Sequence, residues 1–186
     1  MSRSISKSFL DFSCLGPSSP RWVAPCPGSF KINCDGAIMS NICFGSTAFV
    51  VRDSKRCFCE GGSASFPCRT SCMAEATAIK LALDYAVSIQ PCPVQIELDC
   101  KILVEASRDP SKLVQWECFD VMVDIAGSLA SSEFINISWV PRSANKAAHW
   151  IAYAEKCALL PKDWPSSPPK DLTDMLLLDF DRVGVG

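Results

Sequence analysis

Residues 30–36 read FKINCDG, and this short stretch decides the fold class. Apolar and polar residues alternate along it, which is the two-residue period of a β-strand with one buried face. The stretch 94–99, VQIELD, repeats the same alternation. Both stretches finish their polar side with an aspartate, Asp35 or Asp99, so the two carboxylates are expected to have matching orientations.

Further elements flank these two strands. Residues 45–52 and 57–66 are rich in β-branched and aromatic side chains and are joined by a polar turn, which predicts a hairpin. An alanine-rich stretch that Ser71 could cap, and that ends before Pro91, predicts a helix. The later elements are expected to be helices at 101–107 and 112–131, a strand at 134–140 and a helix at 144–158.

The order β-β-β-α-β-α-α-β-α indicates an α/β fold. Because a helical crossover precedes the strand at 94–99, this strand is expected to lie parallel to others in its sheet. We therefore predict a five-stranded mixed sheet, with three antiparallel strands and then parallel strands, flanked by helices.

The length of 186 residues allows one substantial hydrophobic core. Residues 1–28 are rich in Ser and Pro and are predicted to form an irregular lead-in, followed by one domain at 29–158. Residues 159–186 form a Pro-rich extension whose apolar segment, Met175 to Leu178, is expected to dock onto the domain.

The charge balance limits the classes of partner. With 18 basic and 20 acidic residues the net charge is -2, which excludes nucleic-acid binding by bulk electrostatics alone. No basic helix is evident, since Lys101, Arg108 and Lys112 stand isolated among acids. The apolar runs are far shorter than the ~20 residues of a membrane-spanning helix, so no membrane partner is expected. We expect a monomer.

The 12 cysteines are scattered through apolar stretches, where a free thiol behaves as a small hydrophobic group. Zinc ligation by the pairs Cys57/Cys59 and Cys68/Cys72 is the alternative, but their spacings are unusual for zinc and the chain has 1 histidine. Reduced thiols and a nuclear or cytoplasmic location are expected. The basic, serine-rich first residues are a weaker sign of an organelle address.

Three acidic residues are predicted to converge. If the strands of Asp35 and Asp99 are parallel neighbours, their carboxylates meet, and Glu75 points from the first turn of the predicted helix toward the same sheet. Crowded carboxylates require a cation, and oxygen-only ligation favours Mg²⁺ or Mn²⁺. The alternative is purely local, because Asp35-Gly36 is also a turn signal and Glu75 also suits a helix N-terminus.

The chain resembles a known family at several ordered positions. The resemblance is to the plant ribonuclease H-like domains related to non-LTR retroelement reverse transcriptases, and it covers about residues 22–180. The matching blocks are Trp22, Pro25 and Gly28, then 30–37 (FKINCDGA), 51–53 (VRD), 74–76 (AEA), 97–101 (ELDCK) and 139–149 (WVPRSANKAAH).

The resemblance implies a ribonuclease H-like fold and hydrolysis of the RNA strand of RNA–DNA hybrids. It further implies that Asp35, Glu75 and Asp99 hold two Mg²⁺ or Mn²⁺ ions, with Asp35 bridging them. Glu75 is also expected to meet the 2′-hydroxyl that distinguishes RNA from DNA. Nucleic-acid contacts are expected at Gly36, Asn41 and Asn145, although asparagine is also a common turn former and helix cap.

The chain departs from the family pattern at His149. Many members carry a fourth catalytic aspartate at this position, so an imidazole here replaces an anion and is expected to weaken Mg²⁺ binding. The alternative is a helix residue with no ligand role. Two functions therefore remain open: a metal-dependent endonuclease, or a catalytically impaired module that binds nucleic acid or protein. A Ser or Cys hydrolase is disfavoured, because no nucleophile elbow is present.

Overall fold

The computed structural model describes residues 20–113 and 115–179. The helices and strands in chain order are β1 (Phe30–Met39), β2 (Phe44–Asp53), β3 (Phe58–Pro67), α1 (Ser71–Ser88), β4 (Val94–Leu98), α2 (Lys101–Ala106), α3 (Phe119–Ala130), β5 (Ile135–Trp139), α4 (Lys146–Lys156) and α5 (Lys170–Leu178). Short 3₁₀ turns connect some of them, namely η2 (Ser40–Ile42), η3 (Pro110–Lys112), η4 (Trp116–Cys118) and η5 (Arg142–Ala144).

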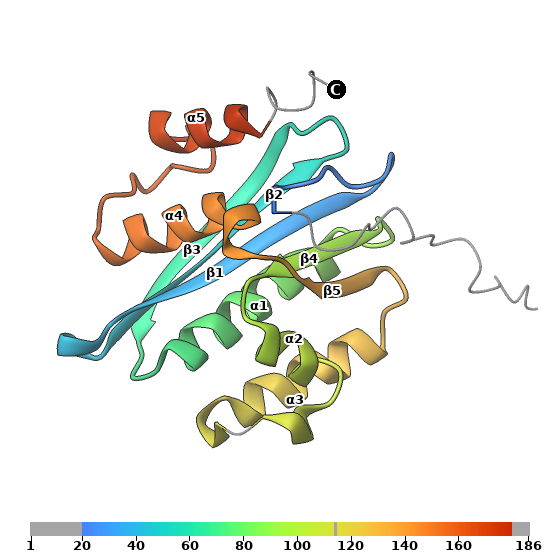
Figure 1. Cartoon of the computed structure of the whole chain (residues 1–186), viewed down its shortest axis with the longest axis vertical. Coiled ribbons are helices and arrows are strands. Elements are labelled where there is room, and N and C mark those ends of the chain that lie inside the picture. Colours follow the sequence, from blue (N-terminus) through green and yellow to red (C-terminus); the bar gives the residue numbers. More distant parts are fainter. Residues whose placement is uncertain (1–19, 114, 180–186) are drawn as a thin grey trace, which may run out of the picture.

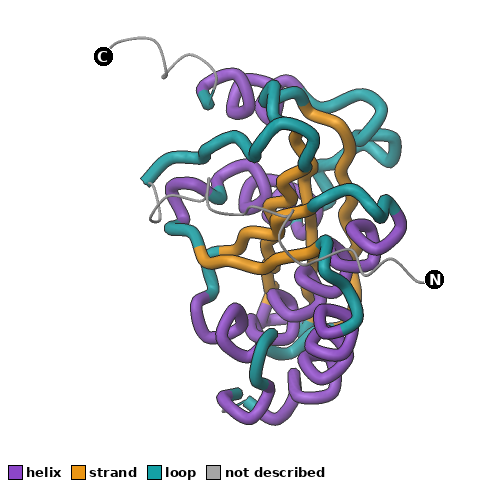
Figure 2. The backbone as a smooth tube through the Cα atoms, turned by 90° about the vertical axis from the view of Figure 1, so that its right-hand side faces the viewer, coloured by secondary structure: helices purple, strands orange, loops and turns teal. Residues whose placement is uncertain are grey.

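The strands form one sheet in the order β3-β2-β1-β4-β5. β1 pairs antiparallel with β2 and parallel with β4, and β5 extends the sheet parallel to β4. Figure 2 shows the strands in the middle of the molecule with helices around them. The five-stranded mixed sheet predicted from the hydrophobic pattern is confirmed.

Helices cover both faces of this sheet. Phe49 and Val51 of β2 belong to a core shared with α1 and α3, whereas Ala48 and Val50 belong to a second core shared with α4 and α5. Successive strand residues therefore face opposite layers, as the pleat requires. In Figure 1, α1, α2 and α3 lie on one side of the sheet and α4 and α5 on the other. Leu176 of α5 is buried, so part of the apolar segment predicted to dock does so.

Three predicted boundaries were wrong. Thr70 rather than Ser71 caps α1, because the Thr70 side chain accepts a hydrogen bond from Met73 N. The helix expected from residue 112 begins at Phe119, after the chain has formed the turns η3 and η4. The last predicted helix begins at Lys146 rather than residue 144, because η5 occupies the preceding residues. The proposed domain limits at 28/29 and 158/159 stay a prediction.

β1 was expected to have one buried face, but its polar side is buried as well. Lys31 and Asn33 are 2% and 0% exposed. Trp22, in the segment before β1, lies against this side and donates a hydrogen bond from Nε1 to Asn33 Oδ1 at 2.8 Å. Buried polar side chains require such partners, and alternation alone does not reveal them.

Most cysteines in the described part of the chain are free thiols, among them Cys34, Cys72 and Cys118. Cys26 is disulfide-bonded, which corrects the expectation of reduced thiols at that position. Between residues 20 and 179, residue 114 apart, no helix has the length and apolar character needed to cross a bilayer.

Candidate active site

The parallel pairing of β1 with β4 places Asp35 and Asp99 side by side. Asn33 pairs with Glu97, and each aspartate follows two residues later on its own chain segment. β4 ends at Leu98, so Asp99 follows a strand end as predicted. Asp35 lies in the middle of β1, contrary to the prediction, because β1 continues alongside β2 after β4 has ended.

Glu75 reaches the same place from α1 because Gly36 has no side chain. A Cβ on Gly36 would lie 2.3 Å from the carbonyl carbon of Ala74, so only glycine allows the α1 backbone to approach β1 this closely. Gly36 N donates a hydrogen bond to Glu75 Oε2 at 3.3 Å. This contact fixes the glutamate carboxylate beside the strand that carries Asp35.

The three carboxylates form an acidic cluster, the name used below for Asp35, Glu75 and Asp99. One oxygen from each lies within 4.8 Å of the others. Burial, followed by the charges of Asp35 and Asp99, raises the pKa of Glu75 to about 9. Burial and the charge of Asp35 also raise the pKa of Asp99, although Arg142 and His149 oppose this rise.

The donor set of this cluster fits a hard divalent cation. All three donors are carboxylate oxygens, which Mg²⁺ and Mn²⁺ prefer and which suit zinc less well. Burial first, and then repulsion between like charges, raises the pKa values of Glu75 and Asp99, and a cation bound among them removes that repulsion. The cluster is therefore chemically suited to a metal, and its catalytic role stays a prediction.

His149 lies at the edge of the cluster. Its Nδ1 is 2.7 Å from Asp35 Oδ2, and its Nε2 is 2.7 Å from Nη2 of Arg142. A guanidinium only donates, so Nε2 accepts from Arg142 and Nδ1–H donates to Asp35. One oxygen of Asp35 is thus already engaged by an imidazole at the position where the family pattern has a fourth carboxylate.

The two predicted asparagines lie in different surroundings. Asn145 is 1% exposed, and its Nδ2 donates to Cys34 O at 3.0 Å, which ties the start of α4 to β1 just before Asp35. Asn41 lies in η2, beyond the end of β1, and is exposed. Contacts of Gly36, Asn41 and Asn145 with nucleic acid stay a prediction.

Sequence reasoning missed two features of the site. Arg142 was treated as a loop residue, yet it contacts His149, and its charge opposes the rise in the pKa of Asp99. Its position seven residues before His149 gave no periodic signal, because Arg142 lies in η5 and His149 in α4. The second feature is the ion pair of Lys31 Nζ with Glu97 Oε1 at 2.7 Å, on the two strands that lead to the cluster.

Sequence comparison identifies the family of this chain and one curated relative. A family model described as "Reverse transcriptase-like" matches residues 33–155. A curated Arabidopsis thaliana protein with a provisional ribonuclease H name is 31% identical over 145 residues. That match covers 74% of this chain and 23% of the Arabidopsis protein, so the chain spans about a quarter of its curated relative's length.

Solved structures show the same fold. The N-terminal RNase H domain of a Mycobacterium tuberculosis protein gives a TM-score of 0.63 at 22% identity, covering 70% of this chain and 95% of that one. RNase H1 of the archaeon Halobacterium salinarum gives 0.62 at 19% identity, covering 68% and 96%. A compost-derived RNase H1 solved with an RNA/DNA hybrid gives 0.61 at 18% identity, covering 70% and 99%. The ribonuclease H-like fold predicted from the sequence is confirmed.

Proposed function

Because this chain belongs to the reverse transcriptase-like family, we propose that it is a divalent-cation-dependent endonuclease that hydrolyses the RNA strand of RNA–DNA hybrids. The observation that carries the proposal is the convergence of Asp35, Glu75 and Asp99, whose oxygens lie within 4.8 Å of one another. A structural relative solved with an RNA/DNA hybrid supports the substrate class.

In this proposal the acidic cluster holds Mg²⁺ or Mn²⁺, two ions in the active state. Bound cations supply Lewis acidity that lowers the pKa of water and neutralises charge on the phosphate. The protein's own contribution is placement: β1 and β4 fix the two aspartates, and the contact of Gly36 N with Glu75 fixes the glutamate. Glu75 is also the proposed contact for the 2′-hydroxyl of the RNA strand.

Cleavage of an end-labelled RNA–DNA hybrid by the purified chain tests this function directly. We expect RNA-strand cleavage with Mg²⁺ or Mn²⁺, and loss of cleavage in Asp99→Asn. Asp124→Asn, which alters an exposed carboxylate on α3, is the matched control and should cut like the unmodified chain. Absence of cleavage at saturating concentrations of both cations would refute the proposal.

The second candidate is a module that keeps the fold for binding but has lost efficient catalysis. It is favoured by one observation, the hydrogen bond between His149 Nδ1 and Asp35 Oδ2. This bond occupies an oxygen that a bridging carboxylate would offer to cations, and the imidazole adds no negative charge. Hybrid binding without cleavage would support this candidate.

Substitutions of His149 distinguish the two candidates, because they test whether residue 149 affects Mg²⁺ binding. His149→Asp restores a fourth carboxylate, so we expect a lower Mg²⁺ concentration at half-maximal cleavage. His149→Gln is the control, because it removes the imidazole without adding charge. If both variants have the Mg²⁺ dependence of the unmodified chain, residue 149 lies outside the metal shell.

A further inference from the structure

A groove of about 550 Å³ runs along α4 beside the acidic cluster. Its lining combines aromatic side chains, Trp150 and Tyr153, with the nitrogen-bearing side chains of Arg142, Lys146 and His149. The acidic cluster contributes none of these lining residues. The groove is therefore a feature of its own that the proposed hydrolysis does not require.

The aromatic part of the groove offers flat surface to solvent. Tyr153 is 48% exposed, and the Nζ atom of Lys156 lies 4.8 Å from the centre of its ring. Trp150 is half-buried against the second core and is thereby held in place. Met175 of α5 contributes to the lining from a second helix. Exposed rings held by a packed helix are the usual platforms for stacking nucleic-acid bases.

The polar part of the groove carries one sign of charge. Arg142 and Lys146 are exposed cations, and none of the residues that line the groove is acidic. This local excess contrasts with the net charge of -2 for the whole chain. Cations interleaved with aromatic rings match a ligand that alternates phosphates with flat bases, which is a nucleic-acid strand.

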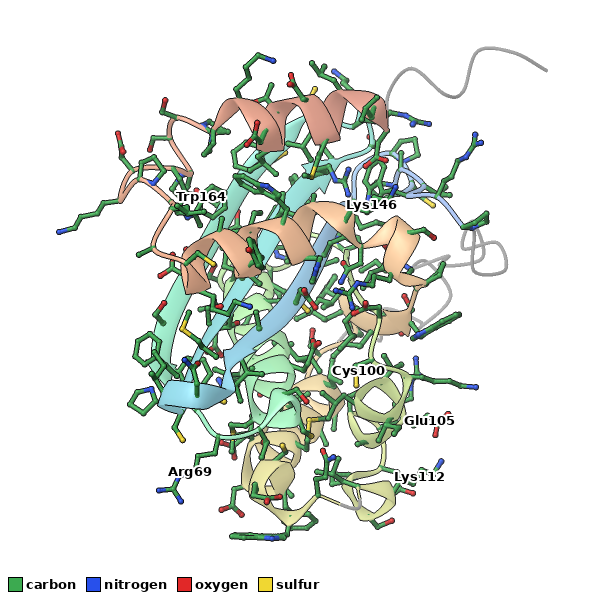
Figure 3. The ribbon with its side chains drawn as sticks, turned by 60° about the vertical axis from the view of Figure 1, so that its left-hand side comes forward. Arg69, Cys100, Glu105, Lys112, Lys146 and Trp164 are labelled. Carbon is green, nitrogen blue, oxygen red and sulfur yellow. The ribbon has the colours of Figure 1, made fainter. Side chains whose placement is uncertain are left out.

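His149 connects the groove to the acidic cluster. His149 lines the groove, and its Nδ1 is 2.7 Å from Asp35 Oδ2. A strand whose phosphate lies at the cluster therefore has the groove within reach of its neighbouring nucleotides. Figure 3 shows Lys146 of the groove on α4, whereas Lys112, which does not line the groove, lies toward the opposite end of the molecule.

We propose that this groove binds an unpaired nucleotide where the strand held at the acidic cluster leaves the paired hybrid as a single-stranded segment. The base stacks on Tyr153 and Trp150, and the phosphates contact Arg142 and Lys146. A base inside a duplex is already stacked and paired, so the groove selects single-stranded segments. The inference rests on the proposed function, because the bound segment continues from the strand held at the acidic cluster.

Binding of a short fluorescein-labelled single-stranded oligothymidylate, followed by anisotropy in EDTA, tests the groove without requiring cleavage. We expect Tyr153→Ala to weaken binding about tenfold, the loss of one stacked base, and Tyr153→Phe to bind like the unmodified chain. Lys146→Ala should reduce the slope of log affinity against log salt by roughly 0.7, the value for one phosphate contact on a single strand.

Two variants elsewhere are the matched controls. Trp116→Ala removes an aromatic side chain that is 80% exposed, and Lys112→Ala removes an exposed cation, both outside the groove. Both should bind the oligonucleotide like the unmodified chain. If Trp116→Ala weakens binding as much as Tyr153→Ala does, the binding is not specific to the groove and the proposal fails.

Photo-crosslinking with a 5-iodouracil oligonucleotide locates the contact. Mass spectrometry should identify Tyr153 or Trp150 as the crosslinked residue, and a crosslink at Trp116 would overturn the proposal. Absence of oligonucleotide binding by the unmodified chain would also overturn the proposal. Self-association that Tyr153→Ala abolishes would overturn it in favour of a protein occupant. Hybrid cleavage without oligonucleotide binding refutes the groove alone, whereas binding without cleavage refutes only the nuclease.

Discussion

Two groups of buried or partly buried side chains lie next to each other around β1 and β4, and they are built in opposite ways. The first, called the paired network here, consists of Trp22, Lys31, Asn33, Arg52, Glu97 and Asp179. The second is the acidic cluster. Two residues along each strand separate them, from Asn33 to Asp35 and from Glu97 to Asp99.

Every carboxylate of the paired network has a cationic partner. Lys31 Nζ is 2.7 Å from Glu97 Oε1, and Arg52 Nη1 is 2.7 Å from Asp179 Oδ2. The Arg52 guanidinium also lies 3.6 Å from the centre of the Trp22 ring. Burial lowers the pKa of Arg52 to about 10, and Asp179 opposes this change. Such pairing leaves the network without the uncompensated charge that a ligand could satisfy.

The acidic cluster lacks this compensation. Within the described residues, no lysine or arginine forms an ion pair with Asp35, Glu75 or Asp99. Instead, burial and then the charge of Asp35 raise the pKa values of Glu75 and Asp99. Burial of acidic residues therefore does not by itself mark a functional site. What marks it is the absence of lysine or arginine partners, since a group of carboxylates without such partners is unfavourable until a cation binds.

Substitution of Glu97 should produce the largest loss of stability. Glu97→Gln leaves the buried Lys31 without its counter-charge, so we expect the free energy of unfolding to fall by roughly 3–5 kcal/mol. Urea unfolding measures this change. The double variant Lys31→Met/Glu97→Gln removes both charges and should recover much of the loss. A single variant as stable as the unmodified chain would contradict the distinction between paired and unpaired acids.

Glu75 should show the opposite behaviour through its pH dependence. Its pKa is raised from 4.5 to about 9, so the folded chain retains a proton that the unfolded chain releases. Stability should therefore decrease as pH rises across this window, by at most about 1.4 kcal/mol per pH unit. Thermal unfolding in EDTA measures the slope, and Glu75→Gln should lack this component. A cation competes with the retained proton, so Mg²⁺ affinity should increase with pH.

If Glu75→Gln retains the full slope between pH 7 and 9, other groups cause it, and the cluster is less strained than the geometry indicates. Cys34 adds a component of its own mainly above about pH 9, because burial and then Glu75, Asp35 and Asp99 raise its pKa well above the ordinary value of 9.0. Cys34→Ala combined with Glu75→Gln separates the two contributions.

The hydrophobic pattern was sufficient to predict the five-stranded mixed sheet and the convergence of the three acidic residues. Alternation of apolar and polar residues in 30–36 and 94–99 predicts which side chains lie on the same face of each strand. A helical crossover then makes the two strands parallel. Glu75 was placed by its spacing from Ile79 on one helix face. These relations are local or follow from connectivity, so a single sequence contains them.

The paired network could not be predicted in the same way. Alternating Lys31 and Asn33 have the pattern of a solvent-facing strand side, and only the packing of Trp22 and Arg52 buries them. Asp35 was assigned to a strand end because the alternation of 30–36 finishes there, whereas the antiparallel pairing with β2 continues the strand to Met39. Both errors concern contacts between distant segments, which periodicity does not encode.

Neutralising Asp99 should stabilise the chain when no cation is present. Burial and the charge of Asp35 raise its pKa, so Asp99→Asn removes an unfavourable charge and should raise the free energy of unfolding. Saturating Mg²⁺ should stabilise the unmodified chain more than this variant, because the cation binds the folded state. Thermal unfolding in EDTA and in Mg²⁺ measures both effects. Destabilisation by Asp99→Asn in EDTA would place Asp99 among the paired acids.

Trp22→Phe should have the smallest effect, because the paired network is redundant. The variant loses the Nε1 donor to Asn33 Oδ1, yet Arg52 Nη2 still donates to that oxygen at 3.0 Å. A phenyl ring also leaves no buried donor unsatisfied. We expect a loss of roughly 0.5 kcal/mol, at the lower end for a buried hydrogen bond. Trp164→Phe, which removes a donor to Ser63 Oγ at 3.0 Å, is the matched control. Urea unfolding compares the two variants, and a loss for Trp22→Phe as large as that for Glu97→Gln would show that the network depends on each single contact.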